Sequence, residues 1–119
     1  MPDVRKVLVT GGAGFIGSHL VDRLLERGDS VTVVDSFDPF YDPSEKRRNL
    51  LPHAGKENFR LVEADIRDLP GLEKGLAGMG FDVICHLAAR AGVRPSIQDP
   101  VTCQEVNVLG TQNLLEIAR

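Results

Sequence analysis

Four glycines fall within seven positions in the stretch TGGAGFIGS, near the start of the 119-residue chain. An apolar, β-branched run (4–10) precedes them, and a segment with apolar residues at three- and four-residue steps (15–27) follows. In this strand–turn–helix context, the spacing Gly12-x-Gly14-x-x-Gly17 matches the fingerprint of a loop that holds a dinucleotide pyrophosphate. One glycine supplies a turn conformation that other residues avoid, the next admits the pyrophosphate, and Gly17 lets helix and strand pack closely. Free N–H groups at the helix start would bind the anion.

The remainder of the chain alternates apolar strand-like and amphipathic helix-like segments. We expect strands at 4–10, 30–35, 59–65 and 81–88, and helices at 15–27, 44–51, 68–79 and 100–119. Asp99 is the expected N-cap of the last helix, with Pro100 at its first position. The pattern predicts one α/β domain over 1–119, a Rossmann-like, doubly wound parallel sheet with strand order 3-2-1-4. A crevice should open between the first and fourth strands, where the order reverses.

An acidic residue closes the second strand. Asp35 stands eighteen positions after Gly17, near the separation at which a carboxylate accepts a hydrogen bond from the adenosine ribose of NAD. The same charge repels a 2′-phosphate, which favours NAD over NADP unless Arg47 or Arg48 swings in from the following connection. Two alternatives remain open: a site for S-adenosylmethionine or another nucleotide, and Asp35 as a simple strand-end cap.

Composition excludes several other classes of function. The net charge is −3, and the one basic cluster, Lys46 to Arg48, is interpreted as a solvated turn of helix, so no nucleic-acid partner is expected. Cys85 and Cys103 lack metal-ligand spacing, as do the histidines, so we expect no metal site and two free thiols in a reducing compartment. No stretch reaches the roughly 18 apolar residues of a membrane span, and the start lacks signal-peptide features. These features predict a cytoplasmic protein without a membrane partner.

The motif TGGAGFIGSHL (10–20) resembles the TGxxGxxG pattern of extended short-chain dehydrogenases/reductases, which include the NAD-dependent nucleotide-sugar epimerases and dehydratases. In that pattern the glycines in register are Gly11, Gly14 and Gly17. The segments ADIRD (64–68), HLAARAGVRPS (86–96) and NVLGTQNLLEIA (107–118) are similar to further motifs of the family. The combination of DPFYDPSEKRRNL (38–50) with AGVRPS (91–96) most resembles the UDP-glucuronate 4-epimerase branch.

The resemblance implies which residues bind NAD and a nucleotide-sugar substrate. The cofactor contacts it implies are Gly11, Gly14, Phe15, Ile16 and Gly17 at the pyrophosphate, Asp35 and Ser36 at the ribose, Asp65 and Ile66 beside the adenine, Leu87, Ala88 and Ala89 under the cofactor, and Asn107 near the active site. Ser36 replaces the asparagine that the family often has, and its hydroxyl can still hydrogen-bond. On the loop after the fourth strand, Arg94 and Ser96 would face the sugar carboxylate or diphosphate. Asp65 as a turn cap and Arg94 as plain surface are the alternatives.

The resemblance implies no catalytic residue in this chain. The family's Tyr-x-x-x-Lys pair has no counterpart here, because the one tyrosine, Tyr41, is followed four positions on by Glu45 and lies in the connection after the second strand. We therefore expect the chain to be the NAD-binding part of a longer enzyme, with an incomplete sheet, no substrate domain and no turnover of its own. The alternatives are a non-catalytic dinucleotide-binding module acting through a partner and a methyltransferase. Self-association is expected through helix 100–119 or the open edge of strand 81–88.

Overall fold

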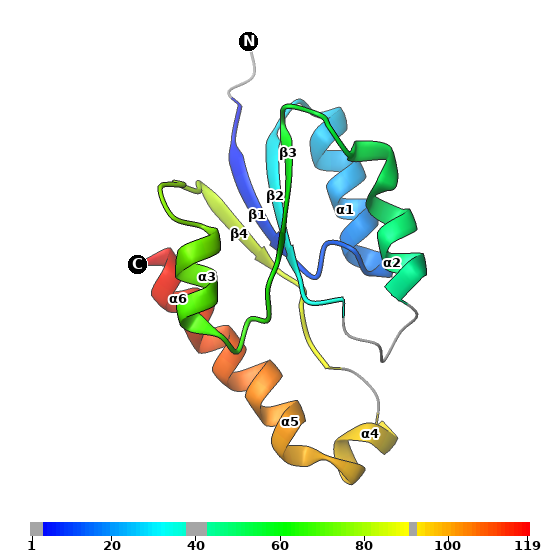
Figure 1. The fold of residues 1–119 in the computed structure, drawn as a ribbon, viewed down its shortest axis with the longest axis vertical. Coiled ribbons are helices and arrows are strands. Elements are labelled where there is room, and N and C mark those ends of the chain that lie inside the picture. The colour runs from blue at the N-terminus through cyan, green and yellow to red at the C-terminus, as the bar shows by residue number, and fades with distance from the viewer. Residues whose placement is uncertain (1–3, 38–42, 91–92) are drawn as a thin grey trace.

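The computed structural model describes residues 4–37, 43–90 and 93–119, and within them four strands form one parallel sheet (Figure 1). The strands are β1 (Lys6–Thr10), β2 (Ser30–Asp35), β3 (Phe59–Glu63) and β4 (Val83–His86). Their order across the sheet is β3-β2-β1-β4, with every neighbouring pair parallel. This confirms the predicted doubly wound, Rossmann-like arrangement, in which a crevice opens where the strand order reverses.

Helices lie on both sides of the sheet (Figure 1). They are α1 (Phe15–Glu26), α2 (Pro43–Leu50), α3 (Leu69–Gly75), α4 (Val93–Gln98), α5 (Pro100–Gln104) and α6 (Gly110–Ala118). A 3-10 turn (Leu51–His53) follows α2, and a π-helical segment (Glu105–Leu109) joins α5 to α6. In Figure 1, α1 and α2 cover one face of the sheet, and α3 and α6 cover the other.

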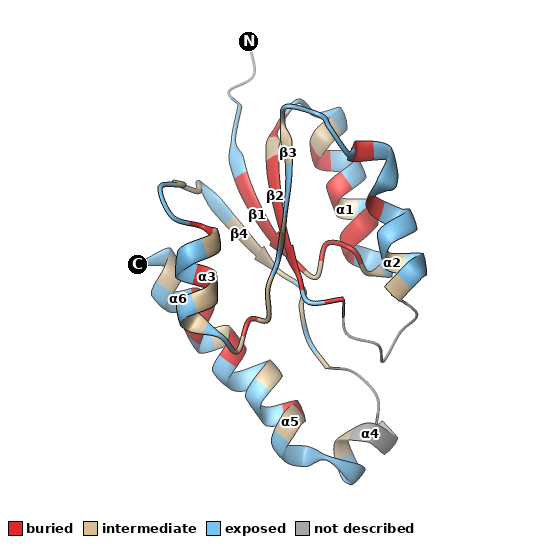
Figure 2. Cartoon of the chain, in the orientation of Figure 1, coloured by how far each residue is buried: buried red, intermediate tan, exposed pale blue. Residues whose placement is uncertain are grey.

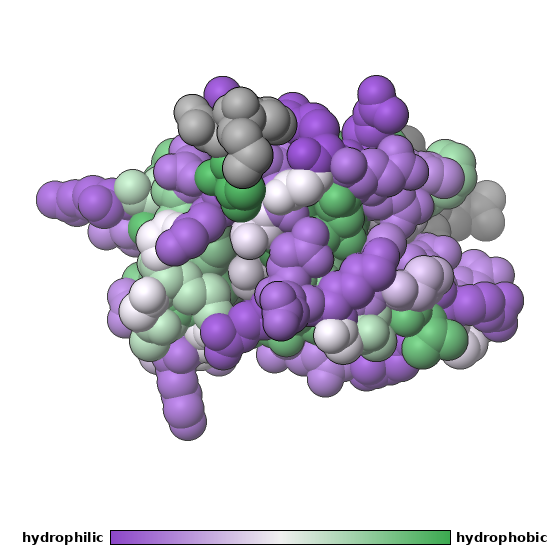
Figure 3. Space-filling model, turned by 90° about the horizontal axis from the view of Figure 1, so that it is seen from above, coloured by the Kyte–Doolittle hydropathy of each residue, from purple (hydrophilic) through white to green (hydrophobic). Residues whose placement is uncertain are grey.

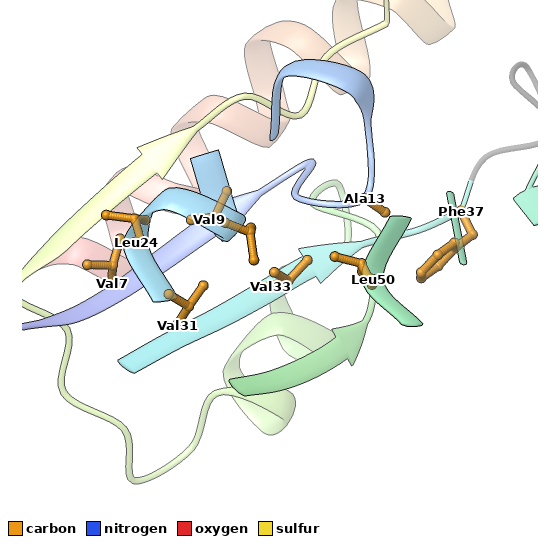
Figure 4. Packing of buried hydrophobic residues seen from close by; sticks show 9 residues of the cluster. Val7, Val9, Ala13, Leu24, Val31, Val33, Phe37 and Leu50 are labelled. Atoms are coloured by element: carbon orange, nitrogen blue, oxygen red, sulfur yellow. The ribbon is translucent and has the colours of Figure 1, made fainter. Parts of the chain in front are cut away.

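Alternation along the central strands divides the core into two halves. Val7 and Val9 of β1 pack with α1 and α2 (Figure 4), whereas Leu8 packs with Leu72 of α3 and Leu114 of α6. Successive side chains of a strand point to opposite faces, so a strand covered on both sides must be apolar at consecutive positions. Accordingly, β1 and β2 are buried over nearly their whole length (Figure 2).

The first helix buries a different face from the one its apolar spacing predicts. Its buried residues include Val21 and Leu24, but Phe15 is 78% and Ile16 70% exposed. These two residues belong to the apolar repeat of 15–27 but do not share its buried face. They stand at the end of the helix beyond the edge of the core, where the glycine turn and not the sheet lies beneath the chain.

The last helical stretch begins as predicted and then departs from a regular α-helix. Asp99 caps it by accepting from the backbone N–H of Thr102 at 3.2 Å, with Pro100 at the first turn. The π-helical segment rotates the faces of the helix that follow it. As a result, Leu109 and Leu115, which the spacing predicts to be inward, are exposed at 42% and 66%. The buried residues of α6 are Gly110, Asn113 and Leu114, of which Leu114 packs with Leu8 of β1, while Gly110 and Asn113 lie against Ile66.

The sheet has two edge strands, β3 and β4, among the described residues. A view onto the end of the molecule opposite the carboxyl ends of the strands shows mostly hydrophilic side chains, with apolar surface on the side of α3 and α6 (Figure 3). That side holds a groove of about 790 Å³ between α3, the open edge of β4 and α6. Its apolar lining residues include Leu76, Phe81, Val83 and Leu115.

Candidate functional site

A cleft of about 700 Å³ opens at the carboxyl ends of the strands, where the glycine turn, β2, α2 and the segment after β4 meet. Ligand sites in doubly wound folds occupy this position, and the volume lies within the range of small-molecule pockets. The residues predicted from the sequence and brought together here are Gly11, Gly14, Phe15, Ile16, Gly17, Asp35, Ser36, Asp65, Ile66, Leu87, Ala88 and Ala89. Asn107 lies next to the cleft through Arg90, which does line it.

The glycine turn follows the register Gly11, Gly14, Gly17. Gly11 adopts φ +71°, which L side chains rarely do, and a Cβ there would lie 2.8 Å from the backbone nitrogen of Ala88. A Cβ on Gly17 would overlap the carbonyl oxygen of Gly11, so glycine at this position lets α1 approach the turn. Gly12, the first glycine of the spacing identified in the sequence, is buried against Val33 and does not face the cleft.

The start of α1 points its free donors into the cleft. Gly14 is the N-cap residue, no side chain caps the helix, and the first turn carries no acidic residue. The first amide groups of an α-helix have no partner within the helix, and its dipole favours an anion at this end. The exposed side chains of Phe15 and Ile16 flank this end and line the cleft. The turn therefore has the donors and the open backbone that a pyrophosphate needs.

Asp35 links the end of β2 to the glycine turn. Its Oδ2 accepts from the backbone N–H of Ala13 at 3.2 Å, and its Oδ1 accepts from the N–H of Phe37 at 2.8 Å. The Nζ of Lys46 donates to the same Oδ1 at 3.2 Å. A carboxylate can accept about four hydrogen bonds, so the three that the described residues make to Asp35 leave room for a ligand hydroxyl. Asp35 is thus a cap of its own turn, as one alternative held, and also a wall of the cleft.

Helix α2 supplies cleft residues that the sequence interpretation missed. Lys46 is only 15% exposed at its side chain and pairs with Asp35, so its description as part of a solvated turn is wrong. One helical turn on, Nδ2 of Asn49 donates to the carbonyl oxygen of Ala13 at 2.9 Å. Residues at i and i+3 of a helix share a face, so the sequence relates Lys46 to Asn49, but it does not show that this face lies against Asp35.

The two arginines that follow Lys46 make different contacts. Arg47 pairs with Glu63 at 2.5 Å and lies over the ring of Phe37 at 4.3 Å from its centroid, whereas Arg48 lines the cleft. Phe37 itself has φ +54°, a conformation that is costly for a bulky residue. The stacked pair holds α2 against the end of β2, with the consequence that Lys46 reaches Asp35.

Asp65 and Ile66 form the wall beyond β3. Asp65 accepts from the backbone N–H of Arg67 at 2.9 Å and from its Nη2 at 2.6 Å. These hydrogen bonds from Arg67, chiefly those of the side chain, hold the pKa of the Asp65 carboxyl below its ordinary value. The side chain of Ile66 is buried against Gly110 in the core, and the residue also lines the cleft. Asp65 therefore caps a turn and also presents a charged carboxylate to the cleft.

The segment after β4 forms the floor of the cleft. Leu87, Ala88 and Ala89 line it, and Ala88 contacts the glycine turn through the close approach at Gly11. Asn107, on the π-helical segment, accepts from the N–H of Arg90 at 2.8 Å and donates to its carbonyl oxygen at 3.2 Å. Short π-helical segments occur frequently at functional sites. Here the segment places an amide side chain where it fixes the far end of the floor.

The two predicted substrate residues lie on a short helix, α4, and not on the expected loop. Ser96 is partly buried, and the side chain of Arg94 lies outside the described part of the chain. Tyr41 also lies outside the described residues. Within residues 4–37, 43–90 and 93–119, no group of three histidine, cysteine or acidic side chains could hold a metal ion. No helix in the described ranges is long and apolar enough to span a membrane.

Residues 8–119 match the family model described as GDP-mannose 4,6 dehydratase. The chain belongs to this family. The match begins inside β1, includes the glycine turn and runs through α6. The Rossmann-like fold inferred from the sequence therefore agrees with the family assignment.

Individual proteins similar to this member of the family are nucleotide-sugar epimerases. UDP-glucuronate 4-epimerase 4 of Arabidopsis thaliana is 44% identical over 115 residues, which are 95% of this chain and 26% of that protein. The crystal structure of UDP-glucose 4-epimerase from Thermus thermophilus in complex with NAD matches with a TM-score of 0.78 and 42% identity, over 93% of this chain and 32% of that one. The structure of UDP-glucuronic acid 4-epimerase from Bacillus cereus, in complex with UDP-glucuronic acid and NAD, matches with a TM-score of 0.78 and 37% identity. This match covers 93% of this chain and 35% of the Bacillus cereus protein. The chain thus spans about a quarter to a third of the length of these relatives.

Proposed function

We propose that this chain is the NAD-binding portion of a nucleotide-sugar epimerase or dehydratase. The observation that carries the proposal is the hydrogen bond from the N–H of Ala13 to Oδ2 of Asp35. It joins the pyrophosphate turn to the ribose carboxylate, so the two groups that a dinucleotide requires belong to one cleft. The fit is chemical as well as spatial: the cleft offers helix-end donors, a carboxylate and a floor of small residues.

Each part of the cleft has a distinct task in this proposal. The amides at Gly14, Phe15 and Ile16 hold the pyrophosphate, with Gly11 and Gly17 letting the backbone come close. Asp35 accepts from the adenosine ribose, and Ser36, exposed beside it, offers a hydroxyl.

The remaining residues of the cleft would contact the adenine and the underside of the cofactor. Asp65 accepts from the exocyclic amine of adenine, and Ile66 borders the ring. Leu87, Ala88 and Ala89 lie under the cofactor, and Asn107 keeps their segment in place through Arg90. When bound, NAD would accept and return a hydride at a sugar carbon.

The substrate class comes from the relatives. UDP-glucuronate and UDP-glucose epimerases, two of them determined with NAD, support NAD as the cofactor and a nucleotide sugar as the substrate. Arg94 and Ser96 on α4 are the residues we propose to face that sugar. The domain proposed here is one NAD-binding unit over 1–119, and the chain alone is proposed to lack turnover.

Calorimetric titration with NAD, NADP and S-adenosylmethionine tests the proposal. We expect NAD to bind most tightly and Asp35→Ala to weaken it, with Glu57→Ala, an exposed acid outside the cleft, as the matched control. Preference for S-adenosylmethionine would instead support a methyltransferase. A non-catalytic dinucleotide-binding module remains the second candidate, favoured if NAD binds but the chain also captures a partner only in its NAD-bound form.

We also propose that the chain self-associates and acts in the cytoplasm. Exposed apolar side chains along α5, the π-helical segment and α6 support the first point: Val101, Val108, Leu109 and Leu115. The occupant we propose for this surface is a second copy of the chain, because burying these residues would remove apolar surface from water. For the second point, the support is that Cys85 and Cys103 are both free thiols.

A further inference from the structure

A network of side-chain hydrogen bonds lies beside the cleft and is centred on a histidine. Thr10 ends β1 and is paired in register with His86, the last residue of β4. Oγ1 of Thr10 lies 2.6 Å from Nδ1 of His86, and Nε2 of the same ring lies 2.9 Å from Oγ1 of Thr111 on α6. One imidazole thus connects β1, β4 and α6.

The surrounding donors fix the direction of each bond. The backbone N–H of Ala88 donates to Oγ1 of Thr10 at 3.1 Å, and the N–H of Leu87 is shared between that Oγ1 at 3.0 Å and the carbonyl oxygen of Thr10 at 3.1 Å. A hydroxyl oxygen accepts two hydrogen bonds and donates one. Since both acceptor places are filled by amides, the hydroxyl proton of Thr10 must go to Nδ1 of His86.

The hydrogen bonds of Thr111 fix the proton on the other nitrogen of the ring. Oγ1 of Thr111 is 2.6 Å from the carbonyl oxygen of Asn107, and a carbonyl can only accept. The hydroxyl proton of Thr111 is therefore used there, and its oxygen accepts from Nε2–H of His86. The Thr111 end places a proton on Nε2, and the Thr10 end leaves Nδ1 without one, so together they require a neutral ring with its proton on Nε2. Burial, which lowers the pKa of His86, favours the same neutral form.

The network holds the floor of the cleft at both ends. At one end, Thr10 binds the amides of Leu87 and Ala88 directly. At the other, Thr111 binds the backbone of Asn107, whose side chain brackets the backbone of Arg90. Segment 87–90 is the part of the chain that lies against Gly11 and lines the cleft.

We propose that His86 is a positioning residue of the cleft, which fixes segment 87–90 beneath the dinucleotide by accepting from Thr10 and donating to Thr111, without touching the cofactor. This inference rests on the proposed function only for the identity of the ligand. The hydrogen-bond directions follow from the geometry alone. His86 affects ligand binding indirectly, by fixing the position of segment 87–90. If that segment were displaced, it would lie at the wrong distance from the cofactor.

Two substitutions of His86 can separate the effects of its hydrogen bonds to Thr10 and to Thr111. In His86→Asn, the side-chain oxygen takes the place of Nδ1 and can still accept from Thr10, while the bond to Thr111 is lost. In His86→Leu, both bonds are lost at a similar side-chain size. His53→Leu is the matched control, because His53 is also hydrogen-bonded through its ring, to Oδ1 of Asp22 at 2.6 Å, and is buried away from the cleft.

The experiment combines NMR of the wild-type chain with NAD titration of the three variants. We expect the imidazole nitrogen shifts to report a neutral ring protonated at Nε2. We expect His86→Leu to shift the amide signals of Leu87 and Ala88 and to weaken NAD binding about tenfold, the scale of one lost hydrogen bond. His86→Asn should keep those two amide signals near their wild-type positions and recover part of the affinity, and His53→Leu should change neither.

Other results would overturn the inference. These are a ring protonated at Nδ1, or a His86→Leu variant whose two amide signals and NAD affinity match those of His53→Leu. A wild-type chain that binds no NAD would overturn the proposed function. The ring tautomer and the amide signals would still decide whether His86 holds the segment, so the two failures can be told apart. A His86→Leu chain that does not fold leaves the decision with the wild-type tautomer and with His86→Asn.

Discussion

Nζ of Lys46 lies 3.2 Å from Oδ1 of Asp35, and the two side chains are only 15% and 4% exposed. This pair places a cation beside the carboxylate that is proposed to read the adenosine ribose. A lone acid at this position repels a 2′-phosphate, whereas a paired acid repels it less. Cofactor preference in this cleft therefore depends on α2 as well as on the end of β2.

Replacing this lysine should sharpen the preference for NAD. In Lys46→Met, Asp35 keeps its two backbone donors but loses its nearest cation, so NADP should lose affinity and NAD should lose little. We expect the ratio of the two affinities to rise about tenfold in favour of NAD, the scale of one charge-assisted hydrogen bond. Calorimetric titration with both cofactors measures the ratio, with Lys74→Met on α3 as the control. An unchanged or lower ratio would show that Lys46 has no part in the choice.

The two glycines that open α1 should respond differently to alanine. Gly17→Ala places a Cβ on the carbonyl oxygen of Gly11 and should destabilise the fold by about 3 kcal/mol, the upper range for overpacking. In Gly14→Ala, the nearest atom to the new Cβ is the same oxygen at 3.3 Å, so the cost should be much smaller. Urea denaturation gives both values, and Gly80→Ala, with nothing within 4 Å, is the control. Equal losses at positions 14 and 17 would contradict the packing described for the turn.

The sequence predicts some features of the glycine turn and not others. The strand order, Gly17 and Asp35 followed from spacing, because the fold fixes where those features meet. The conformation of Gly11 did not, since Gly11 and Gly12 are equivalent by residue type and only the contact with Ala88 distinguishes them. Helix periodicity alone would place Phe15 and Ile16 in the core, because it carries no information about where the sheet ends, and both are exposed.

Lys46 and the π-helical segment were missed for a different reason. A lysine is normally a surface residue, and only the close packing of Arg47 on Phe37 brings α2 near enough for its neighbour to reach Asp35. Likewise, the extra residue in the π-helical segment leaves no mark on composition, yet it decides that Gly110 and Asn113 face inward while Leu115 does not. Tertiary contacts determine both features.

The ion pair between Asp65 and Arg67 predicts a pH-dependent contribution to stability. Side-chain hydrogen bonds from Arg67 hold the pKa of Asp65 below its ordinary value of 3.8. A depressed carboxyl pKa stabilises the fold above that value, and the contribution disappears as the pH falls below 3.8 towards the lowered value. Because both side chains are partly exposed, the effect should stay under about 1 kcal/mol.

Denaturation of Asp65→Asn beside the wild type checks this contribution. The wild type should be more stable at about pH 7, and the difference should shrink as the pH falls below 3.8 and Asp65 takes up its proton. Glu57→Gln, an exposed acid, should show no comparable change. A difference that persists unchanged in acid would mean that Asp65 acts through its shape and not through its charge.

Self-association can be tested on the exposed apolar side chains of the last helical stretch. Val108 and Leu115 are 59% and 66% exposed, and a charge at either position would have to be buried on association. We expect Val108→Glu and Leu115→Glu to shift the chain towards monomer in sedimentation velocity, by about tenfold or more in dissociation constant. Gln112→Glu adds the same charge at an exposed polar residue and is the control. A wild-type chain that remains monomeric at high concentration would contradict the proposal.

The most direct test of the central claim is to map NAD binding on the isotope-labelled chain by NMR. If the cleft is a dinucleotide site, saturating NAD should perturb the amides of Gly14, Phe15 and Ile16 at the start of α1, together with those near Asp35 and Ala88. Perturbations confined to the groove between α3, β4 and α6, or no perturbation in a folded chain, would contradict the assignment of the cleft as the NAD site.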